Sequence, residues 1–485
     1  MARVAVIGGG VAGLSAGIEA AMHGHKVTVC ERCAVAGGNL VGWERAGYHI
    51  DNCIHWLTGT NQRTKLYKTW RRLGVLDTLE VYQPNTLYTV ECDGKSLSLY
   101  SSITETERAM LASSEGDGRE IRSLIRAVRA MNVISGTEPL SPKSIPHFLS
   151  LWGYLGISAR ELSERFHSPL LRKFVGSFFG SDFGAIALIN VFSTFTSGNG
   201  ALPRGGSSAM AAAMAKRLKE LGGELLLSSE VTGIDTEGGR ATAVQLSDGS
   251  RLACDCVLLS CDPKLAEDTL GLPMPHVLKK RYASLPRFSS CHFAFSLDVP
   301  APPFSSDIIL DIPKKYAPLL GGEVLILREF SHESSFAPAG KTLIQAMIFV
   351  SSERAKKIID ERKGSYTDYK RRKEKLAGVV SKIILSRFPE LSGELTLIDS
   401  WTPATVNRYF GSHDGVYMSF ILPKGYLPKR ISTKIRGLKN VFLATQWQNL
   451  PGGLPVAAEC GIRAVRKIKR TKALTDKSKD TVAVH

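Results

Sequence analysis

The feature that most constrains the fold of this chain is a glycine-rich turn near its N-terminal end. Residues 3–7 form an apolar run typical of a buried strand, and the run GGGVAG of residues 8–13 follows it with the spacing G-x-G-x-x-G. Residues 14–23 predict a helix, and residues 26–31 predict a second strand that ends in an acid, Glu31. A strand, a glycine turn, a helix and a second strand in this order predict part of a parallel sheet that binds a dinucleotide.

Each part of this fingerprint has a physical task. Gly8 allows a tight turn off the strand, Gly10 lets a pyrophosphate approach the backbone, and Gly13 lets the helix pack closely against the strand. The helix N-terminus offers free N–H groups and a partial positive charge to the pyrophosphate. Glu31 can accept hydrogen bonds from ribose hydroxyls, and its charge disfavours the 2′-phosphate of NADP. The alternative interpretation is a glycine-rich turn that binds no nucleotide.

A second glycine pair, Gly37-Gly38, follows Glu31 and allows another close approach of a ligand to the backbone, although an ordinary loop is the alternative. The whole pattern resembles the amine-oxidase and phytoene-desaturase superfamily of FAD proteins. That resemblance implies FAD as the cofactor. The fingerprint and the resemblance together predict these FAD-binding residues: Gly8, Gly10, Val11, Ala12, Gly13, Glu31, Arg32, Gly37, Gly38, Asn39, Leu40, Val231, Gly453 and Leu454.

The resemblance also implies tasks for segments outside the fingerprint. In the family, the segment matching residues 39–57 runs along the flavin and opens onto the substrate cavity, and a basic residue is common where this chain has Asn39. The residue matching Val231 lies against the adenine through its backbone. The segment matching residues 451–461 closes over the flavin, so the helix N-terminus near Leu454 can stabilise negative charge on the flavin ring.

The length of 485 residues allows two or three domains, and 44% hydrophobic with 22% charged residues is typical of soluble globular proteins. We expect an α/β fold of mixed character, in which a Rossmann-type FAD-binding domain carries an inserted substrate-binding domain. The expected boundaries are 1–75, 200–270 and 435–472 for the FAD-binding domain, 76–199 and 271–434 for the substrate-binding domain, and 473–485 for a tail. Residues 104–135 are expected to be helical.

The favoured function is FAD-dependent oxidation or reduction of a carbon–carbon bond in a hydrophobic polyene or isoprenoid-like substrate, by hydride exchange with the flavin. His55 is the candidate catalytic residue, and a buried structural histidine is the alternative. The function alternatives are a flavin-dependent cis-trans isomerase and a flavin-free lipid-binding protein. A single fingerprint predicts no separate NAD domain and leaves the electron acceptor open, and no cysteine spacing predicts a metal site.

The net charge of +17 suits anionic membrane surfaces, and basic clusters at residues 370–375 and 463–472 are either solvated helix faces or membrane contacts. No nucleic-acid fold signature accompanies them. No apolar run is long enough to span a bilayer, so we expect a cytoplasmic protein that attaches peripherally to membranes, with residues 147–157 as a shallow apolar foot. The large apolar residues of 139–200 predict either a domain core or a lipophilic cavity.

Overall fold

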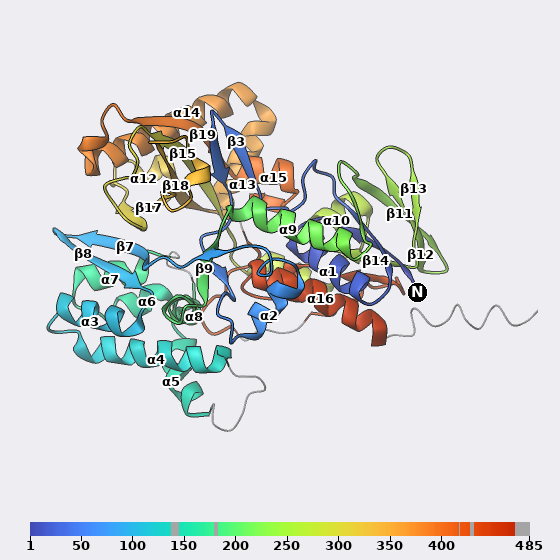
Figure 1. Cartoon of the computed structure of the whole chain (residues 1–485), viewed down its shortest axis with the longest axis horizontal. Helices are drawn as coiled ribbons and strands as arrows, with labels where there is room; N and C mark the ends of the chain where they lie inside the picture. The colour runs from blue at the N-terminus through green and yellow to red at the C-terminus, as the bar shows by residue number, and fades with distance from the viewer. Residues whose placement is uncertain (137–144, 179–182, 417, 427–430, 471–485) are drawn as a thin grey trace, which may run out of the picture.

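The computed structural model describes residues 1–136, 145–178, 183–416, 418–426 and 431–470. One end of the molecule holds a parallel sheet with its helices, and the other end holds a larger mixed sheet and a group of helices (Figure 1). The tail expected at residues 473–485 lies outside the described residues. In the described ranges, we find no helix with the length and apolar character needed to cross a bilayer.

The strand and helix predicted around the glycine fingerprint belong to a five-stranded parallel sheet. Alternate residues of its strands face two different cores. Val4 and Val6 pack in the core that includes the helices α1, α9 and α16, whereas Ala5 and Ile7 pack in a core on the opposite face. The bounds, in sheet order, are β10 Glu224–Leu226, β2 Lys26–Cys30, β1 Arg3–Ile7, β14 Cys256–Leu259 and β20 Val441–Leu443, with α1 Val11–Met22, α9 Gly206–Glu220 and α16 Leu454–Arg470.

These five strands come from three separated parts of the chain, and each part lies in a segment expected for the FAD-binding domain. The middle part also carries a small antiparallel sheet of β11 Val231–Glu237, β12 Arg240–Leu246 and β13 Arg251–Ala253. The strand pairings join the three segments physically, whereas the domain boundaries themselves stay a prediction.

A seven-stranded mixed sheet joins the two remaining parts of the chain, which we call the first excursion (residues 76–199) and the second excursion (residues 271–434). β7 from the first excursion pairs in parallel with β16 from the second, and the other neighbouring pairs are antiparallel. Helices α13 Ser352–Gly364, α14 Tyr366–Arg387 and α15 Pro403–Phe410 pack on this sheet around one apolar core. The strands, in sheet order, are β19 Leu395–Trp401, β15 Phe288–Leu297, β18 Thr342–Ser351, β17 Val324–Glu329, β16 Asp307–Asp311, β7 Thr86–Cys92 and β8 Lys95–Tyr100.

Residues 104–135 are helical as expected, except for a break at residues 114–117 that separates two helices. α3 Ile103–Ser113 ends before Ser114, and α4 Gly118–Gly136 begins after Asp117. The buried Asp117 carboxylate accepts hydrogen bonds from Ser114 Oγ at 2.7 Å and from the His167 N–H at 2.7 Å, which fixes the chain in a turn there. Short polar residues and glycine favour such turns over helix continuation.

α3 and α4 form a helical lobe together with four more helices. This helical lobe lies below the mixed sheet in Figure 1. The four further helices are α5 Ile145–Leu155, α6 Ala159–Ser163, α7 Pro169–Gly176 and α8 Ala185–Thr196. The remaining elements used below are the hairpin of β3 Gly42–Arg45 and β4 Tyr48–Asp51, the strand β5 Leu57–Thr58, and the helices α10 Pro263–Leu270 and α11 His276–Ser284.

Candidate functional site

The candidate site is a continuous cavity of about 1620 Å³ at the carboxyl edge of the parallel sheet. The residues that end or closely follow four of the strands line it: Ile7, Cys30, Ser260 and Thr445. Ligands of open parallel sheets bind in the crevice outside the carboxyl ends of the strands. The fold therefore places this cavity where a dinucleotide would bind.

The glycines of the fingerprint differ in what surrounds them. Gly8 has φ +103°, a left-handed value that a glycine adopts without steric cost. A Cβ on Gly13 would lie 1.9 Å from the carbonyl oxygen of Gly8, so only glycine lets α1 approach β1 so closely. A Cβ on Gly10 would meet no protein atom closer than 3.8 Å, which leaves open space beside its backbone. Gly13 thus serves packing, and Gly10 borders a space that a ligand can fill.

The second glycine pair packs directly against the fingerprint. Gly37 donates its N–H to the carbonyl of Gly9 at 2.8 Å, and a Cβ on Gly38 would lie 3.3 Å from the Cα of Gly10. Both Gly37, at φ +128°, and Gly38, at φ +62°, hold left-handed conformations. Two glycine segments without side chains therefore face each other, and this cradle fits the narrow, anionic pyrophosphate of a dinucleotide.

Glu31 and Arg32 follow β2 and line the cavity beside this cradle. The Glu31 carboxylate is buried and accepts hydrogen bonds from the Gly9 N–H at 2.7 Å and the Cys33 N–H at 2.9 Å. These two bonds fix its orientation, so any ribose hydroxyl must share oxygens that already brace the turn. Arg32 donates to the Arg408 carbonyl at 2.9 Å and is therefore held toward α15.

The structure brings almost every residue predicted to bind FAD to this one cavity, although their binding roles stay a prediction. The exception is Gly13, which lies behind the wall against β1. Gly453, at φ +127°, donates its N–H to Gln446 Oε1 at 2.8 Å and leads into α16. The lining set is Gly8, Gly10, Val11, Ala12, Glu31, Arg32, Gly37, Gly38, Asn39, Leu40, Val231, Gly453 and Leu454.

Sequence reasoning missed Ser260, which follows β14 and also lines the cavity. Its hydroxyl lies 2.7 Å from the Gly8 carbonyl oxygen and 2.8 Å from the Ile7 carbonyl oxygen, so it caps the end of β1 as a donor. The available signal was its place at the carboxyl end of another short apolar strand, because such ends meet at one edge of a parallel sheet.

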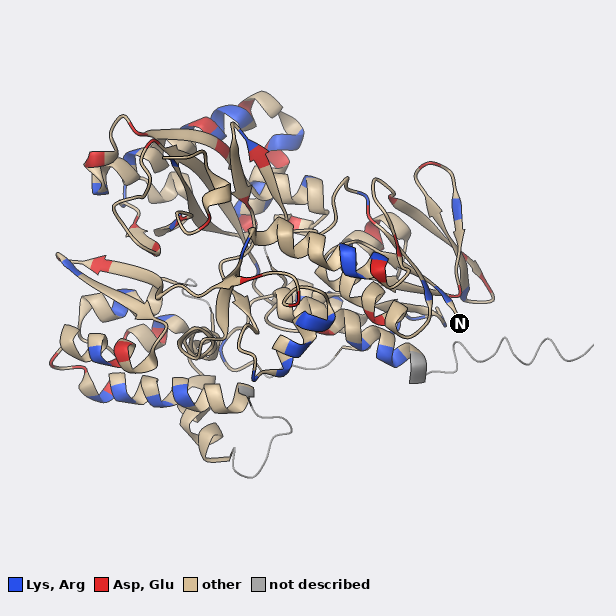
Figure 2. Ribbon diagram, in the orientation of Figure 1, with Lys and Arg blue, Asp and Glu red and all other residues tan. Residues whose placement is uncertain are grey.

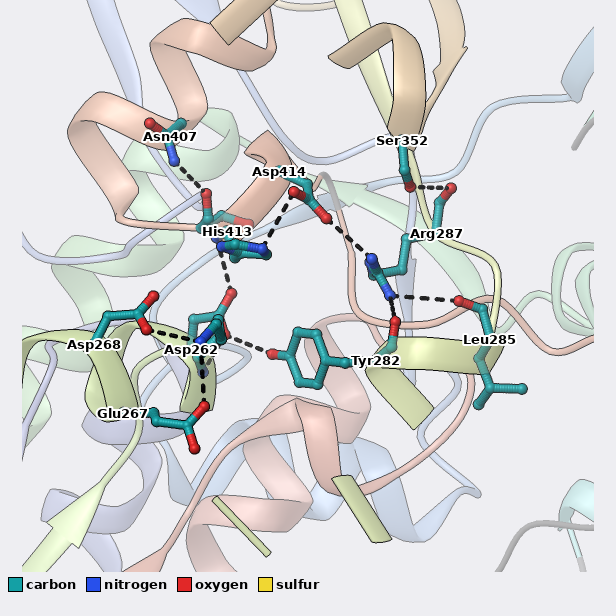
Figure 3. A network of polar contacts seen from close by, with 12 residues as sticks. Asp262, Glu267, Asp268, Tyr282, Leu285, Arg287, Ser352, Asn407, His413 and Asp414 are labelled. Atoms are coloured by element: carbon teal, nitrogen blue, oxygen red, sulfur yellow. Dashed lines mark hydrogen bonds and ion pairs between the residues drawn. The ribbon is translucent and has the colours of Figure 1, made fainter. Parts of the chain in front are cut away.

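A buried polar network supports the wall near Asp262, as Figure 3 shows. Asp262 lines the cavity and caps α10, because its carboxylate accepts a hydrogen bond from the Lys264 N–H at 2.9 Å. The same carboxylate accepts hydrogen bonds from the Tyr282 hydroxyl at 2.5 Å and from the His413 N–H at 3.0 Å. Burial raises the pKa of this carboxyl, and these hydrogen bonds oppose the shift. Tyr282 stacks on Trp447, another lining residue, with ring centroids 4.8 Å apart.

A second arm of the cavity extends into the helical lobe and is mainly apolar. Helices α4 and α8 and the mixed sheet supply its walls. Its lining side chains are Trp56, Met131, Phe178, Phe183, Ile186, Val191, Ile326 and Met347. The two interpretations of residues 139–200 both apply, because Phe174 and Phe192 are fully buried in the core while Phe178 and Phe183 face the cavity.

His55 lines the cavity between β4 and β5, and two charged residues lie near it. Its Nδ1 lies 3.8 Å from Asp307 Oδ2, and Arg328 Nε lies 3.4 Å from the same oxygen. Arg328 also donates to the Ile54 carbonyl at 2.8 Å, which ties the mixed sheet to the His55 segment. Burial and Arg328 lower the pKa of His55, whereas Asp307 opposes this shift. The imidazole is therefore neutral near pH 7 and is able to accept or donate a proton.

Comparison with known proteins agrees with this geometry. The family model for flavin containing amine oxidoreductase matches residues 11–469. The chain is 26% identical to the chloroplastic prolycopene isomerase of Daucus carota over 98% of its own length and 81% of the relative's. It is 26% identical to the neurosporene-forming phytoene desaturase of Rhodobacter capsulatus over 54% of its length and 53% of the relative's. An oxidoreductase structure from Methanosarcina mazei shares the fold with TM-score 0.64 and 16% identity, covering 97% of this chain and all of that chain.

Proposed function

The chain belongs to the flavin-containing amine oxidoreductase family with FAD as its cofactor, and on this premise we propose that it oxidises or reduces a carbon–carbon bond of a hydrophobic polyene. One observation carries the proposal: the glycine cradle and the apolar arm are parts of the same cavity. A dinucleotide in the cradle and an apolar chain in the arm would therefore share one enclosed space. The names of the two relatives, a prolycopene isomerase and a phytoene desaturase, support a polyene substrate.

The cavity walls supply the conditions that such a reaction requires. FAD, when bound, supplies a hydride acceptor or donor. The backbone cradle of Gly10 and Gly38 would hold the pyrophosphate, and the N-terminus of α16 at Leu454 would direct its partial positive charge into the cavity. The aromatic side chains Trp56 and Phe178, with ring centroids 5.9 Å apart, would contact the polyene and exclude water.

We assign to His55 the task of holding or moving a proton at its cavity-facing imidazole. Asp307 and Arg328 do not line the cavity, and they orient His55 from behind. A neutral, buried imidazole suits a reaction in which a hydride leaves one carbon and a proton leaves or joins its neighbour. The alternative of a purely structural histidine predicts that turnover survives its replacement.

The decisive experiment incubates the FAD-loaded enzyme with phytoene or prolycopene in detergent micelles and separates the products by chromatography with mass analysis. Loss of hydrogen from the polyene in the presence of the oxidised enzyme, or gain of hydrogen by the polyene in the presence of the chemically reduced enzyme, supports the proposal. Free FAD in the same micelles is the control. A polyene recovered unchanged under both conditions, from protein that retains FAD, would contradict the proposal.

A second candidate function is flavin-dependent cis-trans isomerisation of a polyene without net redox change. It is favoured by the similarity to prolycopene isomerase over nearly the whole chain. The same incubation separates the two functions, because an isomer has an altered retention time and an unchanged mass. Isomer formed by the reduced enzyme without consumption of reducing equivalents would replace the oxidoreductase proposal with this one.

The proposal also covers where the protein is located and how its substrate reaches it. We propose that the protein is cytoplasmic, that it attaches peripherally to membranes, and that its lipophilic substrate reaches it there. The basic cluster at residues 370–375 lies on α14, away from the helical lobe in Figure 1. Spectroscopic titration of the reduced enzyme with oxygen and quinones would identify the electron acceptor.

A further inference from the structure

Helix α5 carries an unusual concentration of exposed apolar side chains. Trp152 is 74% exposed, Leu149 70% and Ile145 59%, and Phe148 and Leu155 are also exposed. Their spacing of three and four residues places all five on one face of the helix, whereas Leu151 and Tyr154 are buried on the other face. Among the described residues, no other helix or strand carries more than one exposed large apolar side chain. These five side chains therefore form a contiguous apolar patch of the kind that marks an interaction surface.

Basic side chains lie beside this face. α4 packs against α5, and Figure 2 shows several blue Lys or Arg positions along the ribbon of α4. Arg119, Arg122, Arg126 and Arg129 are all exposed and lie on one face of α4, and Arg129 donates to Glu107 Oε2 at 2.8 Å. A further arginine, Arg165, places its guanidinium 5.6 Å from the ring centroid of Tyr154 on α5. α5 itself contains no charged residue, so an uncharged apolar strip lies on the helix next to the row of arginines on α4.

We propose that the exposed face of α5 docks onto an anionic lipid bilayer, with its apolar side chains among the acyl chains and the flanking arginines against the headgroups. An apolar helix face bordered by cations matches the layered chemistry of a bilayer surface. Lipid phosphates pair with Arg119, Arg122 and Arg126. The acyl region takes up Trp152, Leu149 and Ile145. A second copy of this chain fits less well, because two such faces would bring their arginines together.

The position of α5 links this docking to substrate entry, because α5 lies next to the apolar arm of the cavity. This step rests on the proposed polyene chemistry. α5 packs on α4 and α8, whose Met131, Ile186 and Val191 line the apolar arm of the cavity. The Leu155 carbonyl at the end of α5 also accepts the Gly425 N–H at 2.7 Å, near the lining residue Leu422. Docking through α5 thus brings the apolar arm to the bilayer, which holds lipophilic substrates.

The first test is sedimentation of the FAD-loaded protein with vesicles of neutral phosphatidylcholine or of phosphatidylcholine with phosphatidylglycerol. The double variant L149E/W152E should reduce the fraction bound to anionic vesicles about tenfold or more, because two carboxylates would replace the most exposed anchors. The matched control is V277E/L397E, which alters two exposed apolar side chains on other elements and should bind as the wild type does. Equal binding by both double variants overturns the proposal.

The second test locates α5 in the bilayer. Phospholipids brominated on their acyl chains should quench part of the tryptophan fluorescence of the wild type, and Trp152→Phe should lose that quenching while still sedimenting with vesicles. The other tryptophans are largely enclosed, so they provide the unquenched background. Quenching that persists unchanged in Trp152→Phe overturns the proposal, as does an α5-dependent dimer seen by light scattering without vesicle binding.

These readouts are independent of the proposed chemistry. Vesicle binding and quenching require no turnover, so a failure of the polyene reaction leaves them interpretable. Where the reaction does occur, L149E/W152E should convert substrate in detergent micelles at the wild-type rate and substrate in vesicles more slowly. Equal rates in both media for the variant and the wild type would show that α5 plays no part in substrate transfer.

Discussion

Gly10 and Gly13 belong to one fingerprint, but the structure gives them tasks that two alanine variants separate. In Gly13→Ala the new methyl group would lie 1.9 Å from the Gly8 carbonyl oxygen, so α1 must move away from β1. Severe overpacking costs about 3 kcal/mol, and alanine favours a helix interior over glycine by roughly 1 kcal/mol. We therefore expect the cofactor-free protein to lose about 2 kcal/mol of unfolding free energy.

Gly10→Ala should behave in the opposite way. Gly10 precedes α1 with φ −72° and ψ 179°, which alanine adopts freely, and the nearest protein atom to the new methyl is 3.8 Å away. Stability should fall by no more than about 1 kcal/mol, the cost of alanine at a helix N-cap. The methyl would occupy the space opposite Gly38 where the pyrophosphate is expected. FAD should then bind at least about tenfold more weakly, which corresponds to about 1.4 kcal/mol.

Two measurements on each cofactor-free variant test this reasoning. Urea denaturation followed by circular dichroism reports stability, and quenching of FAD fluorescence during titration reports the dissociation constant. The expected pattern is a stable, weakly binding Gly10→Ala and a destabilised Gly13→Ala. Wild-type affinity in Gly10→Ala would refute the cradle as the phosphate site, and wild-type stability in Gly13→Ala would refute the packing argument.

Three further predictions concern the charged and polar groups around the cavity. His55→Gln should lower polyene turnover about 100-fold, the lower range for loss of a general acid or base, while FAD content stays constant; unchanged turnover would make His55 structural. His292 is a buried histidine on β15 whose Nε2 lies 2.7 Å from Ser290 Oγ. Burial lowers the pKa of His55 and of His292, so below about pH 6.5 the unfolded chain takes up protons before the folded chain does. Stability should therefore fall, by up to about 1.4 kcal/mol per pH unit for each histidine. Urea midpoints measured across this range should fall less steeply in His292→Gln, and an identical slope would contradict the assignment. Tyr282→Phe removes the hydroxyl that donates to Asp262 and should cost about 1–3 kcal/mol in urea denaturation; wild-type stability would show that the network contributes nothing there.

Local signals made the cofactor half of the cavity predictable. The strand, glycine turn and helix around Gly10 depend on backbone geometry within a short stretch, which the sequence displays directly. Partners brought together from distant segments were not predictable in this way. Ser260 reaches the Gly8 carbonyl, and Asp307 reaches His55, only because the sheets place them there. Nothing in the sequence near residue 307 indicates that contact.

The break between the helices at Ser114 to Asp117 illustrates a different limit of prediction from sequence. Helical periodicity continues on both sides, and the turn is held by the buried Asp117 and its bonds to the backbone of residues 167 and 168. Tertiary contacts of this kind override local propensity. The sequence likewise could not assign each aromatic residue of 139–200 to the core or to the cavity wall, because both environments select the same side chains.

The parallel sheet is completed by β20, whose Val441 lies beside Val257 of β14 although the whole segment 271–434 separates them along the chain. Ribosomes deliver the chain from its N-terminal end, so β1, β2, β10 and β14 emerge long before their last neighbour. Until then the open edge of β14 presents unpaired N–H and C=O groups, and α1 lacks the covering helix α16. We therefore expect flavin to be loaded late in biogenesis, and an mRNA truncated before codon 441 to yield a polypeptide that holds the glycine fingerprint but does not retain FAD.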